Sequence, residues 1–317
     1  MSSVAPPTPP RKQPPSGRRP GLRSRPAPIF LAAPFLLVFA TFYILPIGYA
    51  LWDSVHKRIR SPGLNFAAAP RVVWAGFENY SNVLKDPSFR RGILRVVEFG
   101  IIQVPVMLVL ALILALIIDS GRVPFTGFFR TAAFLPYAVP GVIAAILWGF
   151  LYDPGISPIS TLLGHLGLGR VNFLNVRLVL WSIGNIVTWS WTGYNMLIIY
   201  SSLRAIPSTI LDAARIDGAS EWQLATRIKV PMLVPALVLT AVFSVIGTLQ
   251  LFTEPSVLEK LTGAVDSAYT PNLMAYTAAF VTNNTYFAAA ISVSLALITF
   301  VLSFALLRAT WRRALEA

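Results

Sequence analysis

The sequence has 317 residues, of which 55% are hydrophobic and only 12% charged, and its formal net charge is +13. This composition excludes an ordinary soluble globular protein and is typical of a membrane protein. The absence of cysteine excludes disulfide frameworks, thiolate metal sites and cysteine nucleophiles, and the two histidines, His56 and His165, are far apart in the sequence. We therefore expect neither a metal site nor a cysteine nucleophile in this chain.

The N-terminal residues 1–28 are rich in proline and serine and carry six basic residues without a single acidic one. Such a segment cannot bury a hydrophobic core, so the sequence predicts a disordered tail. A basic arm of this kind either binds nucleic acid or anchors the cytoplasmic end of a membrane helix beside the lipid head groups. Because a long apolar stretch follows directly, we favour the membrane anchor and expect no nucleic-acid partner.

Six windows without ionisable residues follow the tail, at residues 26–52, 99–118, 131–152, 178–203, 230–253 and 267–307. Each is long enough for about 20 residues to cross a hydrocarbon layer of about 30 Å, and the helix of the last window is placed near 286–307. The first window is too long for a signal peptide and no A-x-A-like cleavage site follows it. The sequence thus predicts an all-α membrane protein, with six transmembrane helices in a domain at 29–310 and a short tail at 311–317.

The distribution of basic residues predicts the orientation of these helices. With the N-terminus inside, 15 of the 26 basic residues lie on the cytoplasmic side and 11 outside, eight of them at residues 57–95. The basic residues at 57–95 oppose the rule that basic residues concentrate on the cytoplasmic side. The acid-free tail beside the first helix nevertheless places the N-terminus in the cytoplasm. Both termini and the loop between the fourth and fifth helices are therefore expected in the cytoplasm.

The windows themselves contain no Asp, Glu, Lys, Arg or His. Ion-coupled transporters and proton relays usually need ionisable groups along the pathway, and a membrane-embedded hydrolase needs an acid, a base or a metal ligand. The chain also has no G-x-x-x-x-G-K-S/T phosphate loop. If the protein moves a solute, the energy is expected to come from another chain, with a secondary transporter as the alternative.

The loop at about 204–231 carries the charged stretch "LDAARIDGASEWQLATRIKVPML" at 211–233. Two capping boxes, Thr209 with Asp212 and Ser220 with Gln223, predict the starts of two short helices. Gly218 suits the left-handed residue that ends the first helix. Pro231 is expected to end the second, with Val230 before it extended.

Helices of about ten residues are not stable alone in water, so these two need a surface to pack on. Helical spacing places four residues on one face of each predicted helix: Ile210, Ala213, Ala214 and Asp217 in the first, and Trp222, Ala225, Ile228 and Lys229 in the second. Three basic residues could form a charged rim around these faces: Arg215, Arg227 and Lys229. Residue physics alone leaves two interpretations open, a docking surface for another protein and a self-packed connector.

This loop resembles the cytoplasmic coupling loop of binding-protein-dependent ABC importer permeases, whose pattern is E-A-A, then G, then I-x-L-P. Asp212 stands here in place of the usual Glu, and Val230 in place of the usual Leu. The segments at 134–155, 189–207 and 271–300 are similar to the carbohydrate-uptake branch, although a Gly-rich segment is reduced to "LTGAVDSAYTP". The resemblance implies that the following residues contact the ATPase: Asp212, Ala213, Ala214, Asp217, Gly218, Ala219, Trp222, Ile228 and Pro231.

The family resemblance implies a permease subunit, itself not an enzyme, in a bacterial cytoplasmic membrane. The implied partners are a second permease subunit in a heterodimer, two cytoplasmic ATPase subunits that bind the ATP, and an extracytoplasmic solute-binding protein. The implied substrate is a sugar or oligosaccharide, and the alternatives are a non-sugar solute such as glycerol phosphate or a secondary transporter. ATP-driven closure of the ATPases would move the docked loop as a lever. This motion would switch the helices between outward and inward access.

Polar and aromatic residues at membrane depth are candidates for contacting a sugar, because sugars offer hydroxyl groups and apolar C–H faces. The candidates lie in the fourth and fifth predicted helices: Asn185, Trp189, Trp191, Tyr194, Asn195, Thr248 and Gln250. Ser190 and Thr192 lie beside them in the fourth helix. For each residue the alternative is packing and hydrogen bonding between helices.

Overall fold

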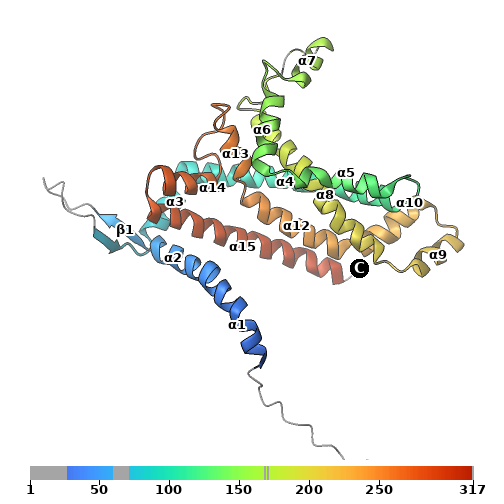
Figure 1. The fold of residues 1–317 in the computed structure, drawn as a ribbon, viewed down its shortest axis with the longest axis horizontal. Helices are drawn as coiled ribbons and strands as arrows, with labels where there is room; N and C mark the ends of the chain where they lie inside the picture. Colours follow the sequence, from blue (N-terminus) through green and yellow to red (C-terminus); the bar gives the residue numbers. More distant parts are fainter. Residues whose placement is uncertain (1–26, 60–70, 168, 170, 316–317) are drawn as a thin grey trace, which may run out of the picture. The chain divides into compact units, whose positions relative to one another are not determined.

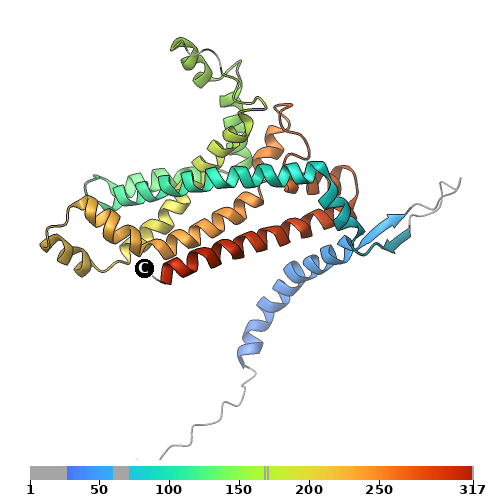
Figure 2. The same cartoon turned by 180° about the vertical axis from the view of Figure 1, so that it is seen from behind.

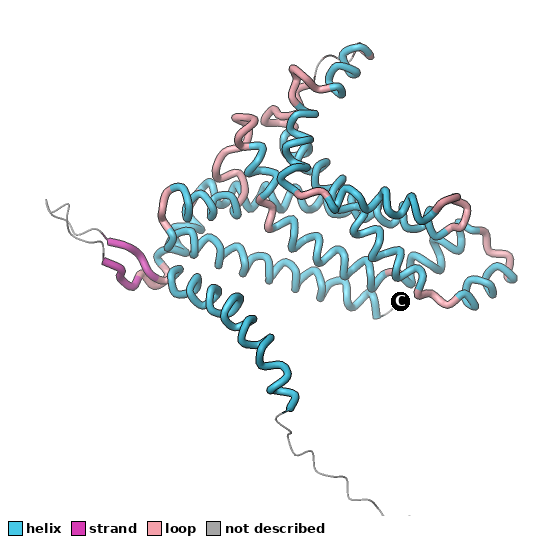
Figure 3. The backbone as a smooth tube through the Cα atoms, viewed as in Figure 1, coloured by secondary structure: helices cyan, strands magenta, loops and turns pink. Residues whose placement is uncertain are grey.

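The computed structural model describes residues 27–59, 71–167, 169 and 171–315, which are mostly helical (Figure 1). The chain divides into two units, residues 1–48 and Tyr49–Ala317. The greater part of the expected basic tail, residues 1–26, lies outside the described residues. Figure 3 shows that short loops connect most of the helices in the second unit.

The first predicted window forms one continuous helical run. It consists of α1 (Ala27–Phe39), a π-helical turn η1 (Ala40–Ile44) and α2 (Leu45–Ser54). The π-turn lies just before Pro46, which has no N–H to donate, and Leu45 N–H bonds to Ala40 O, five residues back. The stretch Leu31–Ser54 is long and apolar enough to cross a membrane.

A small hairpin and a short helix begin the rest of the second unit. Strands β1 (His56–Ile59) and β2 (Arg71–Trp74) pair antiparallel, with His56 opposite Trp74, and α3 (Glu78–Lys85) follows. The buried Asn79 side chain donates hydrogen bonds to Ser54 O at 2.9 Å and His56 O at 2.7 Å. These bonds fix the start of α3 against the end of α2.

The second predicted window lies in the long helix α4 (Pro87–Asp119), which Asp86 caps through bonds from the N–H groups of Ser88 and Phe89. The third window does not form the single helix expected at 131–152. It is divided into α5 (Thr126–Ala138) and α6 (Gly141–Tyr152), bent by 93°. Pro140 cannot donate a backbone hydrogen bond and keeps Val139 extended, so the helix stops there.

The remaining helices follow in the order of the later windows. Their bounds are α7 (Pro158–His165), α8 (Val179–Arg204), α9 (Ser208–Ile216), α10 (Glu221–Gln223), η2 (Leu224–Lys229), α11 (Val230–Met232), α12 (Val234–Leu249), α13 (Thr253–Leu258), α14 (Pro271–Tyr276), η3 (Thr277–Val281) and α15 (Thr285–Leu315). The helix expected near 286–307 is therefore present as part of α15.

Helices α4, α8, α12 and α15 lie side by side in the second unit (Figures 1 and 2). One buried cluster joins α4 to α8, with Ala111, Ala115, Met196 and Ile199 at its centre. Gly193 permits a close approach of α8 to α5, because a Cβ at this position would collide with the carbonyl oxygen of Ala133. The small residues Ala and Gly thus allow the backbones to pack closely, as is usual for helices in membranes.

Among the described residues, four helices are long and apolar enough to cross a membrane: Leu31–Ser54, Pro87–Asp119, Val234–Leu258 and Thr285–Thr310. The bent pair α5–α6 gives a fifth if it is one span. Length and composition therefore support four or five spans where six were predicted. The remaining predicted span corresponds to α8, in which polar residues such as Asn185, Thr188 and Asn195 interrupt the apolar sequence.

Candidate functional sites

The first half of the charged loop is the short helix α9, and it does not begin with the predicted capping box. Pro207 occupies the N-cap position, with no side-chain hydrogen bond, and its carbonyl accepts the Ile210 N–H at 3.2 Å. Thr209 consequently lies inside the first turn and does not cap the helix. The prediction for Gly218 is confirmed, since its φ is +83° and Ala219 N–H bonds back to Ala214 O at 2.9 Å.

The second half of the loop begins with the predicted capping box. Ser220 Oγ accepts the Gln223 N–H at 3.3 Å, and Gln223 Oε1 accepts the Ser220 N–H at 2.7 Å. The helical run then continues through η2 and α11 instead of stopping at Pro231, and Val230 is helical at φ −60° and ψ −46°. The expected proline stop and extended Val230 are therefore wrong.

The π-helical turn explains this continuation. Val230 N–H bonds to Ala225 O, five residues back, so the turn before Pro231 contains one extra residue. This wider turn relieves the clash between the proline ring and the carbonyl four residues earlier. The extra residue also rotates the helix, so that Trp222 is exposed and Lys229 buried, although an uninterrupted α-helix would place both on one face.

Arg215 connects the two halves of the loop. Its guanidinium donates to Asp212 Oδ1 at 3.1 Å and lies 3.5 Å from Glu221 Oε1. All three side chains are between 38% and 62% exposed, so each pair contributes at most about 1 kcal/mol. Arg215 thus orients α9 relative to α10 more than it stabilises either helix.

Apolar side chains of the loop remain uncovered. Ile216 is 87% exposed and Trp222 is 77% exposed, and α9 buries none of its residues. Beside them is a hollow of about 260 Å³ lined by Asp217, Gly218, Ala219, Gln223, Arg227 and Ile228. The loop therefore exposes apolar side chains beside a hollow next to Gly218, and of these two side chains Trp222 was predicted and Ile216 was missed.

Lys229 differs from the other basic residues of the loop and does not belong to the predicted charged rim. Its Nζ donates to Asp119 Oδ2 at 2.6 Å, and the two side chains are only 7% and 8% exposed. Asp119 is the last residue of α4, so this buried ion pair joins the loop directly to a long helix of the bundle. The sequence signal for Asp119 was its position directly after the apolar window 99–118.

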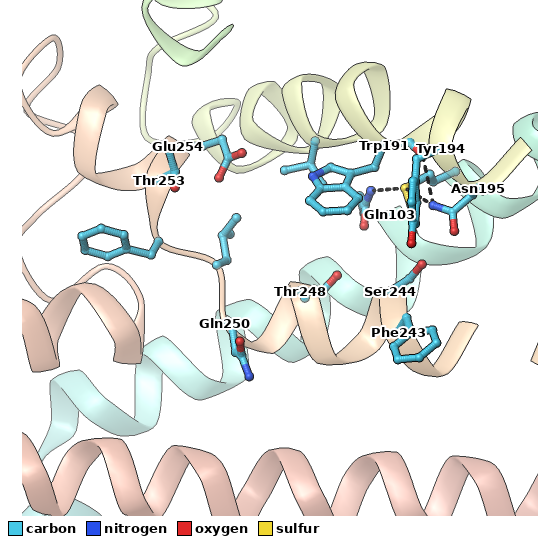
Figure 4. Close-up of a pocket in the computed structure, with 15 residues that line it drawn as sticks. Gln103, Trp191, Tyr194, Asn195, Phe243, Ser244, Thr248, Gln250, Thr253 and Glu254 are labelled. Carbon is cyan, nitrogen blue, oxygen red and sulfur yellow. Dashed lines mark hydrogen bonds between the residues drawn. The ribbon is translucent and has the colours of Figure 1, made fainter. Parts of the chain in front are cut away.

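The structure places five of the seven candidate substrate contacts around one cavity of about 360 Å³ among α4, α8, α12 and the turn into α13 (Figure 4). These residues are Trp191, Tyr194, Asn195, Thr248 and Gln250. Tyr194 stacks on Tyr137 with ring centroids 4.7 Å apart, and Asn195 Nδ2 donates to Trp191 O at 3.1 Å. Aromatic faces and amide or hydroxyl groups are thus combined in one wall.

The other two candidates lie elsewhere and pack between helices. Asn185 Nδ2 donates to Tyr152 OH at 2.7 Å and borders a separate hollow with Trp148 and Trp181. Trp189 makes an edge-to-face contact with Trp148, with centroids 5.8 Å apart. In the structure these two residues contact neighbouring helices and do not line the cavity of the other five.

Sequence analysis missed several residues of the cavity wall, which are Gln103, Met107, Phe243, Ser244, Phe252, Thr253 and Glu254. Gln103 and Met107 come from the middle of α4, where the residues around them are uniformly apolar. Glu254 was placed outside the fifth window, which ends at 253, but α12 ends at Leu249 and the chain turns Glu254 into the wall. The cavity wall thus contains an ionisable residue, although the six charge-free windows contain none.

The chain belongs to the family of binding-protein-dependent transport system inner membrane components, whose model matches residues 75–313. It is 32% identical over 278 residues to the lactose transport system permease protein of Rhizobium radiobacter, covering 86% of this chain and 90% of that protein. It is 30% identical over 220 residues to the sn-glycerol-3-phosphate transport system permease protein of Salmonella typhi, covering 69% and 72% of the two chains.

The fold has a close counterpart among solved structures. A chain of a bacterial alginate ABC transporter, crystallised with an alginate pentasaccharide-bound periplasmic protein, superposes with a TM-score of 0.73 at 19% identity. The match covers 91% of this chain and 94% of that one. The predicted membership of this permease family is confirmed, and the chain is a transport subunit of an inner membrane.

Proposed function

We propose that the chain is the permease subunit of an ATP-driven importer that carries a sugar or short oligosaccharide across a bacterial cytoplasmic membrane. The single observation that carries this proposal is the 32% identity to a lactose permease over nearly the whole of both chains. The cavity agrees with it, because aromatic rings beside amide and hydroxyl groups suit the C–H faces and hydroxyls of a sugar.

We further propose that the helices cross the membrane six times and that both termini are cytoplasmic. The spans are the run α1–α2, then α4, the pair α5–α6, α8, the run α12–α13, and α15. Helix α8 has 26 residues, which at 1.5 Å per residue gives roughly 39 Å, enough to cross about 30 Å of hydrocarbon. Its polar residues Trp191, Tyr194 and Asn195 line the cavity, which supports a span that is only partly lipid-facing.

The loop α9–α11 is the proposed docking site for a cytoplasmic ATPase, which binds the ATP in place of this chain. The exposed Ile216 and Trp222 and the hollow beside Gly218 support docking, since a self-packed connector would cover its own apolar residues. The buried Lys229–Asp119 pair offers a direct route for the movement of the docked loop to reach α4. The other partners are a second permease subunit, a second ATPase subunit and an extracytoplasmic solute-binding protein.

Uptake measurements in cells test the proposal. Cells that lack this chain are compared with complemented cells for uptake of labelled lactose, trehalose, maltose and glycerol 3-phosphate. We expect restored uptake of a sugar, loss of that uptake on ATP depletion, and little effect of a protonophore while ATP is maintained. Restored uptake of glycerol 3-phosphate alone would favour the phosphate-carrying alternative, and uptake that follows the proton gradient would favour a secondary transporter.

A further inference from the structure

Glu254 is the only carboxylate in the cavity wall, which contains no Lys, Arg or His among the residues that the structure describes. The residue is 9% exposed, and Figure 4 shows its carboxylate directed toward the space in front of Trp191. Among the described residues its carboxylate makes no salt bridge, whereas the buried Lys229 is paired with Asp119. Burying a carboxylate without an opposite charge is costly, so a carboxylate at a cavity wall indicates a role toward what enters there.

A hydrogen-bond acceptor without a partner among the described residues lies in the same wall. Gln103 uses its amide nitrogen on Thr188 Oγ1 at 3.3 Å, while its buried Oε1 has no hydrogen-bond partner among the described residues. The cavity therefore offers a carboxylate and an amide oxygen that both accept hydrogen bonds, and its described residues include no cationic group. Such a wall suits a ligand that donates hydrogen bonds, through hydroxyl or ammonium groups, and opposes one that carries a negative charge.

We propose that Glu254 is a specificity residue that admits neutral and amino-bearing sugars to the cavity and rejects anionic solutes such as phosphorylated polyols and uronic acids. This inference rests on the proposed function and names the class of substrate for that site. Neutral sugars donate hydroxyl hydrogens to the Glu254 carboxylate and to Gln103 Oε1, and an amino sugar adds an opposite charge. An anionic group entering the same space would meet a like charge without any basic residue of the described wall to offset it.

The expected size of the discrimination follows from Coulomb's law. Two like charges about 5 Å apart, at an effective dielectric constant of about 20, repel strongly enough to weaken binding by more than about tenfold. Replacement of Glu254 by Gln removes the charge and keeps nearly the same shape. We therefore expect the substitution to improve binding of an anionic sugar by at least about tenfold and to change that of a neutral sugar by less than about threefold.

The test uses the assembled importer in detergent and three probes with one common ring: glucose, glucosamine and glucuronate. Trp191 in the cavity wall serves as a reporter, and binding is followed by tryptophan fluorescence at millimolar sugar concentrations. The variant is Glu254→Gln. The matched control is Glu259→Gln, because Glu259 lies five residues further on, pairs with Lys260 at 3.6 Å and does not line the cavity.

We expect the wild-type protein to bind glucosamine at least as well as glucose and to bind glucuronate most weakly. Glu254→Gln should reduce the ratio of the affinities for glucose and glucuronate by at least about tenfold, and Glu259→Gln should leave this ratio unchanged. If wild type and Glu254→Gln bind glucose and glucuronate with the same ratio, the charge selection is refuted while a sugar site stands. Binding of none of the three probes by the wild type would instead refute the sugar pathway itself.

Discussion

The charged loop and the cavity differ in how their residues come together. The loop α9–α11 is built within 25 residues, and its main contacts are between neighbours in the sequence, such as the pair Ser220 and Gln223. The cavity is built by residues from α4 to α13, with Gln103 and Glu254 far apart in the sequence. Local patterns therefore describe the loop, whereas the cavity depends on how long helices pack and where they end.

The Lys229–Asp119 pair is an exception to this difference between local and long-range contacts, because it joins the loop to the distant helix α4. We expect Lys229→Met or Asp119→Asn to lower the free energy of unfolding by about 3–5 kcal/mol, since each leaves one buried charge unpaired. The double variant should recover most of this loss, because no charge then remains without a partner. Thermal denaturation of the purified protein in detergent measures the effect.

The control for this experiment is Lys260→Met. Lys260 also lies near a carboxylate, Glu259 at 3.6 Å, but its side chain is 77% exposed, so the change should cost at most about 1 kcal/mol. A double variant no more stable than the weaker single variant would show that Lys229 and Asp119 act independently. The loop would then be joined to α4 by packing alone.

The loop signals that could be recognised in the sequence were those that act over one turn of helix. The Ser220–Gln223 capping box and the left-handed Gly218 depend only on near neighbours, and both are present. Pro231 was misjudged because a π-turn, whose extra residue leaves no mark in the sequence, lets the helix continue past it. Thr209 was misjudged because Pro207 supplies the helix start two residues earlier.

The cavity was predictable only in part, for a different reason. Trp191, Tyr194, Asn195, Thr248 and Gln250 stand out because they are polar or aromatic within apolar windows. Whether such a residue of α8 faces the cavity or a neighbouring helix depends on the rotation of α8 about its axis. In the structure this rotation directs the Asn185 side chain to the hydroxyl group of Tyr152 and not into the cavity. Glu254 could be found only by knowing that α12 ends at Leu249, well before the charge-free window does.

Gly218 offers a way to separate backbone strain from docking. We expect Gly218→Val to cost about 1–2 kcal/mol in backbone strain, because its φ is +83°, and in addition to release the ATPase. Beyond its two chain neighbours, no atom of the described residues lies within 4 Å of a Cβ added at Gly218, so we expect the steric effect of Val to come from a docked partner. Pull-down of the ATPase in detergent, together with sugar uptake, measures this second effect.

Gly121 is a matched control for this substitution. It also has a left-handed backbone, with φ of +68°, and a Cβ added there would likewise meet no described atom within 4 Å beyond its chain neighbours, but it lies between α4 and α5. Gly121→Val should therefore carry the same strain and retain the ATPase. If Gly218→Val retains the ATPase and uptake as well as Gly121→Val does, the loop is a connector and the coupling assignment fails.

The cavity can be tested by comparing amides that face it with one that does not. We expect Asn195→Ala and Gln250→Ala each to reduce sugar uptake about tenfold, or ~1.4 kcal/mol, because a hydrogen-bonding group is removed from the wall. Asn185→Ala should leave the sugar concentration for half-maximal uptake unchanged and lower only stability, because its amide bonds Tyr152 within the bundle. Asn195→Ala and Gln250→Ala should in contrast raise this concentration, and equal effects of all three substitutions on it would remove the distinction between wall and packing residues.

The smallest expected effect belongs to Arg215, which joins α9 to α10 at the surface. Arg215→Met should change the free energy of unfolding by less than about 1 kcal/mol, because both of its ion pairs are exposed to water. It should nevertheless weaken retention of the ATPase by a few-fold, since the exposed Ile216 and Trp222 would no longer be held in one arrangement. Raising the salt concentration should weaken ATPase retention by wild type more than by Arg215→Met, because salt screens the exposed pairs that only wild type has.

Unfolding midpoints in detergent and ATPase pull-downs at low and high salt measure both effects. A large loss of stability would mean that Arg215 supports the fold of the loop itself, and unchanged retention of the ATPase would mean that the relative orientation of α9 and α10 does not matter for docking.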